Sequence, residues 1–208
     1  MKNYQKKSNV TAIVAIIAIA AFVIGGIYML SRGSGSPQAG GDPMHSGSAA
    51  ASVGSPNDLV GKPAPQFSLQ DRNGTTYTND SLKGEDVVLF FNEGIMCYPA
   101  CWNQMVALPQ LNSSNTVALS VVIDQPSDWQ SAIQKMPQLA SATVLFDTDK
   151  SVSNEYGMLT VNSSMHYGSY PGHTFVLIDK QGIVRYVFDD PNMGIDNDKI
   201  AGELAQMN

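Results

Sequence analysis

The feature that most constrains this chain is an uncharged apolar run near its N-terminus, residues 10–30 (VTAIVAIIAIAAFVIGGIYML). As an α-helix this run would be about 31 Å long, close to the thickness of the hydrocarbon core of a bilayer. Lys2, Lys6 and Lys7 precede the run, and only Arg32 follows it closely. Because cytoplasmic flanks carry the excess of Lys and Arg, the pattern predicts a single-pass anchor in the cell membrane. Residues 1–9 would be cytoplasmic and the bulk of the chain extracytoplasmic.

A cleaved signal peptide is the alternative interpretation of this segment. The apolar region of a signal peptide usually has about 7–15 residues and ends at a cleavage site of the small-x-small type. The run here is longer, the nearest such site is at residues 49–51, and no cysteine that could carry a lipid lies near its end. An uncleaved anchor is therefore expected.

Residues 31–56 (SRGSGSPQAGGDPMHSGSAAASVGSP) are rich in Gly, Ser, Ala and Pro. Such a segment has too little apolar surface to offset the entropy lost on ordering it, so it predicts a flexible linker. Its mean reach would be about 25–30 Å. The remaining residues, 57–208, are expected to form one domain.

The charge of this domain excludes some partners. Residues 57–208 contain 17 acidic and 8 basic residues, a formal charge of −9. Nucleic acids and anionic lipid surfaces attract basic proteins. We therefore expect no nucleic-acid partner, and we ascribe membrane association to the anchor alone.

Apolar runs bounded by turn residues predict an α/β domain. Strands are expected at residues 66–69, 75–78, 87–92, 116–124, 143–146, 173–179 and 183–188. Asn73-Gly74 would close a hairpin between the first two strands, and Gly182 a hairpin between the last two. Helices are expected at residues 102–108, 127–136 and 197–207. Together these elements predict a sheet covered by helices, with an antiparallel hairpin at one edge.

The two cysteines of the chain, Cys97 and Cys101, lie where the buried strand 87–92 gives way to a helix. Unpaired N–H groups at a helix N-terminus favour a thiolate, so Cys97 is predicted to be the attacking sulfur. Cys101 is one helical turn further on, at a Cα separation of about 6 Å that permits a disulfide.

A purely structural disulfide is the alternative, because an extracytoplasmic compartment favours oxidation. However, a disulfide between Cys97 and Cys101 closes only a short loop. Closing a short loop stabilises a fold less than closing a long one. The position and the spacing therefore favour redox or metal chemistry.

Several segments carry a family resemblance. They are GKPAPQFSL at residues 61–69 with Asp71 and Gly74, VVLFFN at residues 87–92, and YPGHTFVLID at residues 170–179 with Gly182. Over nearly all of residues 57–208 the chain resembles the thioredoxin-like superfamily. The likeness is to its redoxin branch, which includes peroxiredoxins and membrane-tethered thiol–disulfide oxidoreductases. The resemblance implies a thioredoxin-like mixed sheet flanked by helices, and it implies that Pro171 is a cis-proline that presents backbone to a substrate.

The main functional prediction is thiol–disulfide exchange with protein thiols or disulfides, without a cofactor beyond the cysteines. Cys97 would attack a substrate disulfide or be oxidised, and Cys101 would resolve the mixed disulfide. Residues 98–100 separate the cysteines, whereas the usual motif of this superfamily has two intervening residues. Trp102, directly after the pair, would cover the site for a substrate or join the core.

Reduction of hydroperoxides is the first alternative. Peroxidases of the redoxin branch activate the peroxide with a Thr and an Arg. Here Gly94 stands at the position of the Thr, three before Cys97, and Phe90 stands seven before Cys97, where the family has a Pro. Residues 172–174 (GHT) stand where the strand with the Arg is expected to start. Cys101 could still resolve a sulfenic acid on Cys97.

Copper handling is the second alternative. The chain is also similar to Sco-type copper chaperones, which are anchored thioredoxin-like domains with a Cys-x-x-x-Cys motif and a distant His. In this interpretation Cys97, Cys101 and His173 would bind copper, for which thiolate and imidazole ligands are suited. No metal is required by the main prediction.

Overall fold

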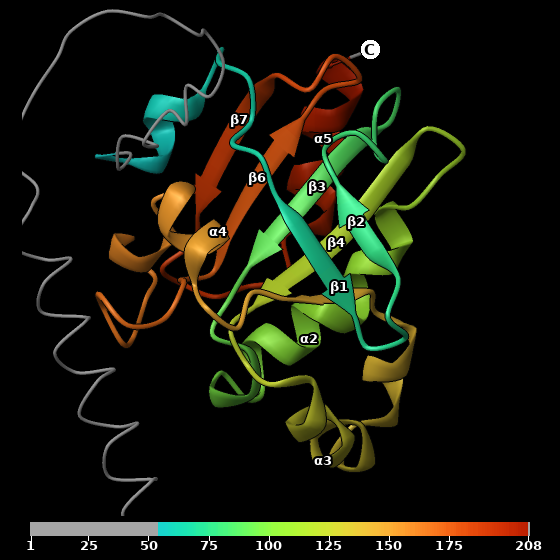
Figure 1. Ribbon diagram of the computed structural model, residues 1–208, viewed down its shortest axis with the longest axis vertical. Helices are drawn as coiled ribbons and strands as arrows, with labels where there is room; N and C mark the ends of the chain where they lie inside the picture. The colour runs from blue at the N-terminus through green and yellow to red at the C-terminus, as the bar shows by residue number, and fades with distance from the viewer. Residues whose placement is uncertain (1–53, 208) are drawn as a thin grey trace, which may run out of the picture. The chain divides into compact units, whose positions relative to one another are not determined.

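The computed structural model describes residues 54–207 (Figure 1). Its strands are β1 (Ser68–Asp71), β2 (Thr76–Thr78), β3 (Asp86–Phe91), β4 (Thr116–Val122), β5 (Val144–Phe146), β6 (Thr174–Ile178) and β7 (Val184–Asp189). Its α-helices are α2 (Ala100–Ala107), α3 (Trp129–Lys135), α4 (Ser151–Glu155) and α5 (Asn197–Gln206). Short 3₁₀ helices are η1 (Pro56–Leu59), η2 (Gly94–Met96), η3 (Leu108–Leu111), η4 (Pro126–Asp128), η5 (Pro137–Ser141) and η6 (Met158–Thr160).

The strands form one mixed sheet in the order β2-β1-β5-β4-β3-β6-β7. Strands β3, β4 and β5 are parallel, while β6 pairs with β3 in the antiparallel sense. The two predicted hairpins are present as the antiparallel pairs β1–β2 and β6–β7. The predicted thioredoxin-like α/β sheet with flanking helices is thus confirmed.

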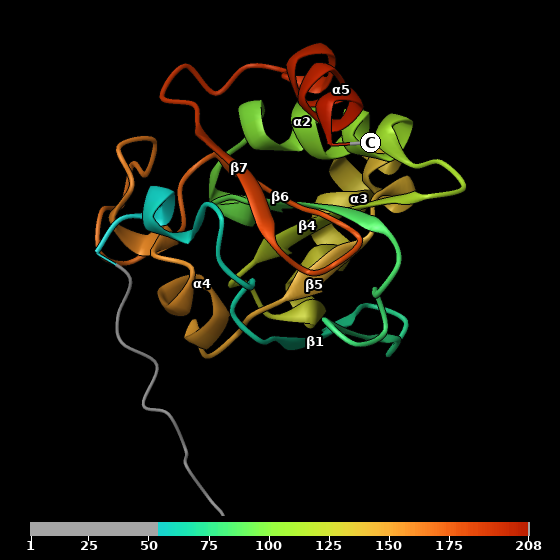
Figure 2. The ribbon, with the colours of Figure 1, turned by 90° about the horizontal axis from the view of Figure 1, so that it is seen from above.

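Alternate residues of β3 face two separate cores. Val88 and Phe90 pack with apolar residues of α2, α3 and α5, whereas Leu89 and Phe91 pack on the opposite face with residues of α4 and η1. Figure 2 shows the helices on both sides of the sheet. A strand buried on both faces has a continuous apolar sequence, which explains the run at residues 87–91.

The helix predicted at residues 102–108 is α2 (Ala100–Ala107), but Cys97 does not lie at its N-terminus as predicted. The 3₁₀ helix η2 occupies residues 94–96, so Cys97 lies three residues before α2. Gly94 adopts φ +57° and turns the chain, and its carbonyl accepts the N–H of Cys97 at 3.2 Å.

The predicted anchor at residues 10–30, and the predicted linker up to residue 53, lie outside the described residues. Between residues 54 and 207 no helix is both long enough and apolar enough to cross a membrane. The described fold begins with η1, whose first residue, Pro56, is buried.

Candidate active site at the cysteine pair

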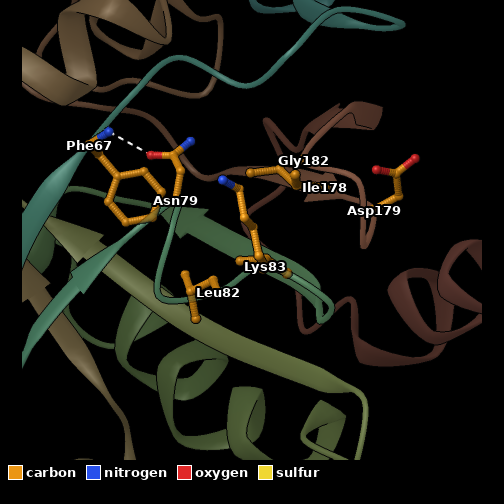
Figure 3. Close-up of a pocket in the computed structure, with 8 residues that line it drawn as sticks. Phe67, Asn79, Leu82, Lys83, Ile178, Asp179 and Gly182 are labelled. Carbon is orange, nitrogen blue, oxygen red and sulfur yellow. Dashed lines mark hydrogen bonds between the residues drawn. The ribbon is translucent and has the colours of Figure 1, made fainter.

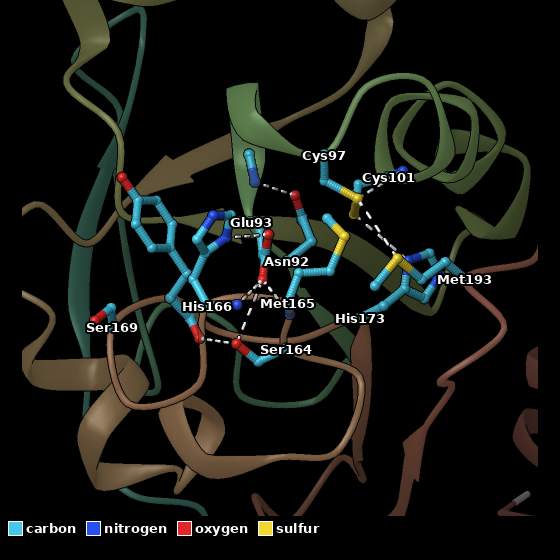
Figure 4. Close-up of polar contacts among 12 residues, drawn as sticks. Asn92, Glu93, Cys97, Cys101, Ser164, Met165, His166, Ser169, His173 and Met193 are labelled. Atoms are coloured by element: carbon cyan, nitrogen blue, oxygen red, sulfur yellow. Dashed lines mark hydrogen bonds and ion pairs between the residues drawn. A yellow bond between two sulfur atoms is a disulfide. The ribbon is translucent and has the colours of Figure 1, made fainter.

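Cys97 and Cys101 form a disulfide beyond the C-terminal end of β3 (Figure 4). Their Cα atoms are 5.3 Å apart, in agreement with the expected pairing. Cys97 is 2% exposed, and Cys101, on α2, is 0% exposed. The backbone N–H of Cys101 points at Cys97 Sγ, 3.3 Å away. This N–H would favour a thiolate on Cys97 once the pair is reduced.

Asn92 holds the loop between β3 and the cysteines. Its side chain donates to Ser120 Oγ at 2.8 Å and accepts the N–H of Gly94 at 2.9 Å.

Gly94 cannot easily be replaced by another residue. A Cβ at this position would lie 1.8 Å from Asp124 Oδ2, and the positive φ of Gly94 also disfavours other residues. Threonine therefore cannot occupy this position, three before Cys97, without moving the loop.

Asp124 follows β4 and contacts the same loop, accepting the N–H of Ile95 at 3.0 Å. Burial raises the pKa of Asp124 to about 6, and the Ile95 N–H partly opposes this shift. A carboxyl group with this pKa can exchange a proton near neutral pH. Asp124 therefore places a titratable group against the loop that carries Cys97.

Glu93 is 1% exposed and is fully engaged with a distant segment. Its Oε1 accepts the N–H groups of Met165 (2.6 Å) and His166 (3.0 Å), and its Oε2 lies 2.9 Å from His166 Nδ1. The hydroxyl group of Ser164 is a further donor, at 3.3 Å. Glu93 therefore ties the segment 164–166 to the start of the cysteine loop.

On the other side of the pair lie His173 and Met193 (Figure 4). His173 Nδ1 is 3.6 Å from Cys101 Sγ, and Met193 Sδ is 3.9 Å from Cys97 Sγ. The His173 ring is 0% exposed and packs edge-on against Phe90. Burial lowers the pKa of His173 to about 4, although the charge of Asp190 acts in the opposite direction. The imidazole is therefore neutral at physiological pH.

The structure corrects one expectation about Pro171. Within residues 54–207 the Tyr98–Pro99 bond is the cis peptide bond, so the Tyr170–Pro171 bond is trans. Hydrogen bonds fix the backbone on both sides of the latter bond: the Ser164 hydroxyl group donates to the Tyr170 carbonyl at 2.9 Å, and Gly172 N–H donates to the Met158 carbonyl at 3.1 Å. Pro171 itself is buried, two residues before His173.

Trp102 is placed in the core. It is 2% exposed, and its Nε1–H donates to the Gly94 carbonyl at 3.0 Å. The exposed side chains around Cys97 are its sequence neighbours Met96 (54%) and Tyr98 (49%). A role for Trp102 or Pro171 in substrate binding stays a prediction.

The sequence analysis did not find Met193, Asp190 or Asp196 as neighbours of the site. They lie about a hundred residues from Cys97 in the sequence and carry no motif. Only the pairing of β6 with β3 and β7 brings the loop after β7 to the cysteines. A separate pocket, lined by residues including Phe67, Leu82 and Ile178 (Figure 3), lies near the opposite, N-terminal end of β3 and is not part of this site.

A thioredoxin-like sheet with a cysteine pair at the end of its central parallel strand defines the class of redoxin-type proteins. Residues 60–187 match the AhpC/TSA family. The chain therefore belongs to this family.

Curated relatives support the same assignment. "Putative peroxiredoxin bcp" of Coxiella burnetii is 30% identical over 143 residues, which are 66% of this chain and 91% of that protein. "Peroxiredoxin Q, chloroplastic" of Triticum aestivum is 30% identical over 133 residues, which cover 62% of this chain but only 58% of that protein. The reduced 2-Cys peroxiredoxin of Plasmodium vivax superposes with a TM-score of 0.58 at 23% identity, covering 71% of this chain and 95% of that structure. At 23% identity, the similarity to the Plasmodium vivax structure shows only a shared fold.

Proposed function

We propose that this protein is a membrane-anchored, extracytoplasmic thiol–disulfide oxidoreductase that cycles between a Cys97–Cys101 dithiol and the corresponding disulfide. The observation that carries the proposal is the disulfide itself, formed between residues four apart at the end of β3. A purely structural disulfide that closes so short a loop would stabilise the fold only weakly.

The exchange would run through Cys97. In the reduced protein the Cys97 thiolate attacks a substrate disulfide, and one substrate sulfur leaves as a thiolate. Cys101, deprotonated, then attacks Cys97 Sγ, the second substrate sulfur leaves, and two electrons have passed to the substrate. The reverse sequence oxidises a substrate dithiol. The Cys101 N–H that faces Cys97 Sγ supports the assignment of Cys97 as the attacking and leaving sulfur.

Exposed apolar side chains beside Cys97 favour a protein substrate. Met96 and Tyr98 are about half exposed on either side of this cysteine, and Lys135 Nζ lies 3.6 Å from the centre of the Tyr98 ring. Exposed Met and Tyr side chains are common at protein-binding surfaces. They would contact the segment around a substrate cysteine.

The location rests on the sequence. The uncharged run at residues 10–30 and the excess of lysine before it support a single-pass anchor with the redox domain outside the cytoplasm. Cysteine-accessibility labelling of intact and permeabilised cells would test this orientation, with single cysteines placed at residue 3 and at the exposed residue 201 of a Cys97→Ser, Cys101→Ser chain.

Trapping of the mixed disulfide tests the proposed exchange. In the full chain in detergent, Cys101→Ser should accumulate a covalent adduct with a disulfide-containing protein substrate, because the resolving sulfur is missing. Cys97→Ser should form no adduct. An adduct that forms equally well with Cys97→Ser would overturn the assignment of the nucleophile.

Reduction of hydroperoxides is the alternative that the names of the relatives favour. In the described part of the chain the two arginines are engaged elsewhere: Arg72 donates to the Ala140 carbonyl and Arg185 pairs with Asp179. Gly94 also excludes a Thr three residues before Cys97. Stopped-flow reduction of hydrogen peroxide by the dithiol form, at a rate well above that of a free thiol, would establish the peroxidase activity in its place.

Copper binding is a second candidate, because four soft donors meet at the site. Besides the two sulfurs, His173 Nδ1 and Met193 Sδ lie within 4 Å of Cys101 Sγ and Cys97 Sγ respectively. Such a set suits Cu(I). Retention of one Cu(I) per reduced chain, lost in His173→Ala, would support this function. Exchange activity without copper retention would exclude it.

A further inference from the structure

His173 also belongs to a second group of possible ligand atoms. A ring nitrogen of His173 and one carboxylate oxygen each from Asp190 and Asp196 all lie within 4.8 Å of one another. His173 is 0% exposed and Asp190 5% exposed. His173 comes immediately before β6, Asp190 directly after β7, and Asp196 at the start of α5. The fold therefore brings the three together from separate segments.

One atom each of His173 and Asp196 is buried and forms no hydrogen bond of standard geometry: His173 Nε2 and Asp196 Oδ2. The rest of the Asp196 side chain is partly exposed, and its carboxyl group interacts with that of Asp190. Buried polar atoms in native proteins are nearly always paired. His173 Nδ1 is directed at Cys101, so Nε2 is the ring atom available to another ligand.

The ligand atoms of the cluster suit a cation. Asp190 and Asp196 offer carboxylate oxygens and His173 offers an imidazole nitrogen, and the three atoms lie within 4.8 Å of one another. Lys199, close to Asp196 in the sequence, packs its Nζ on the Phe188 ring. Neutral imidazole and carboxylate are also the forms in which these side chains bind metals.

We propose that His173 Nε2, Asp190 and Asp196 form a binding site for a divalent transition-metal ion of the Zn²⁺ type. Three atoms no more than 4.8 Å apart can all be reached from one point at about 2.8 Å, and Zn–N and Zn–O bonds are about 2.0–2.2 Å long. Movements of less than about 1 Å would close the site. One nitrogen and two oxygens form an open three-ligand set, which leaves a position for water.

The surrounding loop holds the ligands in place. Asp190 accepts the N–H groups of Asn192 (3.0 Å) and Gly194 (2.7 Å). The side chain of Gln104, on α2, accepts the N–H of Asp196 at 2.8 Å. Between them Met193 adopts a left-handed conformation, φ +52°, which is uncommon for a residue other than glycine. The same turn therefore places the two carboxyl groups near His173 and the Met193 sulfur near Cys97.

The site would also communicate with the redox pair, and this part of the inference rests on the proposed function. A metal on Nε2 leaves the ring proton on Nδ1, which then donates toward Cys101 Sγ. A reduced sulfur accepts such a hydrogen bond better than a disulfide sulfur does. The dithiol form is therefore expected to bind the metal more tightly, and by linkage the metal favours the dithiol.

Zn²⁺ binding to the oxidised full chain in detergent tests the site, because the disulfide keeps both sulfurs from binding zinc. Isothermal titration calorimetry should show one Zn²⁺ per chain. Asp196→Asn and Asp190→Asn should each weaken binding by at least about tenfold. Binding should survive in the Cys97→Ser, Cys101→Ser double variant, and in His166→Ala as a matched control. This result would separate the site from a copper site on the cysteines.

Absence of saturable Zn²⁺ binding, or binding that Asp196→Asn leaves unchanged, would overturn the site. Asp196→Asn keeps the size of the side chain, and a circular dichroism spectrum would confirm its fold; His173→Gln is the second variant. Mn²⁺, which prefers oxygen ligands to thiolates, tests the linkage by electron paramagnetic resonance. A few-fold tighter binding to the reduced chain is expected, and equal binding would overturn the linkage. An inactive exchange assay with Zn²⁺ binding intact would reject only the proposed function.

Discussion

Glu93 and His173 lie on opposite sides of the cysteine pair (Figure 4). Glu93 and the His173–Asp190–Asp196 cluster differ in how their polar atoms are paired. Both oxygens of Glu93 have hydrogen-bond partners, contributed by residues 164–166. In the cluster, His173 Nε2 and Asp196 Oδ2 have none. A fully paired carboxylate fixes two segments to each other, whereas unpaired buried atoms remain free to bind a ligand. We therefore assign the first to stability and the second to chemistry.

The largest effect is expected for Glu93→Ala. The substitution leaves the N–H groups of Met165 and His166 without their acceptor and opens a cavity, so the free energy of unfolding should fall by about 3 kcal/mol. Urea denaturation would measure this loss. Glu203→Ala, at a half-exposed site on α5, is the control and should cost less than about 0.5 kcal/mol. Equal losses in the two variants would remove the distinction drawn above.

Asp124 lies between these two cases, because its side chain is half-buried and accepts one backbone hydrogen bond, from the N–H of Ile95. Its folded pKa of about 6 lies above the unfolded value of about 3.9. Protonated Asp124 therefore stabilises the fold at low pH, and this contribution is lost as the pH rises through about 6. Between pH 4.5 and 8 the loss should be about 2 kcal/mol. Urea denaturation at the two pH values should show it in the wild type and not in Asp124→Asn; identical pH dependences would contradict the assignment.

Asp196→Asn should raise the free energy of unfolding, whereas Glu93→Ala should lower it. Burial and Asp190 raise the pKa of Asp196, so its ionised form destabilises the fold at high pH. In metal-free buffer at pH 8 the variant should gain less than about 1 kcal/mol, because the side chain is partly exposed to solvent. Thermal unfolding in the presence of a chelator measures this gain. A loss of stability would show that Asp196 has a structural partner.

The smallest effect is expected for His166→Gln. The His166 side chain is 42% exposed while its partner Glu93 is 1% exposed, but a glutamine amide can still donate to Glu93 Oε2, so the loss should be less than about 0.5 kcal/mol. The backbone N–H of residue 166 still binds Glu93 after the substitution. A urea-denaturation midpoint close to that of the wild type is expected. A loss as large as that of Glu93→Ala would assign the effect of Glu93 to the imidazole ring and not to the backbone groups.

Much of the fold could be predicted because its signals are local. The continuous apolar run that forms β3 and the Asn73-Gly74 turn depend only on neighbouring residues, and both were located to within two residues. Helix α2 was also located to within two residues, but the 3₁₀ helix that separates it from β3 was not predicted. That segment is held by Asp124, which accepts the N–H of Ile95 from the end of another strand.

The site was predicted in part for the same reason. Cys97 and Cys101 are close in sequence, so their pairing follows from helical spacing. Pro171 was expected to be cis from a resemblance, whereas hydrogen bonds at Tyr170 and Gly172 hold a trans bond. The contact of Met193 with Cys97 has no counterpart in the sequence pattern.

The sequence by itself determined the apolar N-terminal run, the acidic charge of the domain, the order of the strands and the cysteine pair, because each depends on composition or on spacing over a few residues. Helix α4 (Ser151–Glu155) was not predicted. Only the tertiary structure decided which groups surround the pair. His173, Met193 and Asp190 reach it through the pairing of β3, β6 and β7. Burial then sets the chemistry of His173. Its imidazole would titrate near pH 6.5 in water, and burial beside Cys101 holds it neutral although the charges of Asp189 and Asp190 act in the opposite direction.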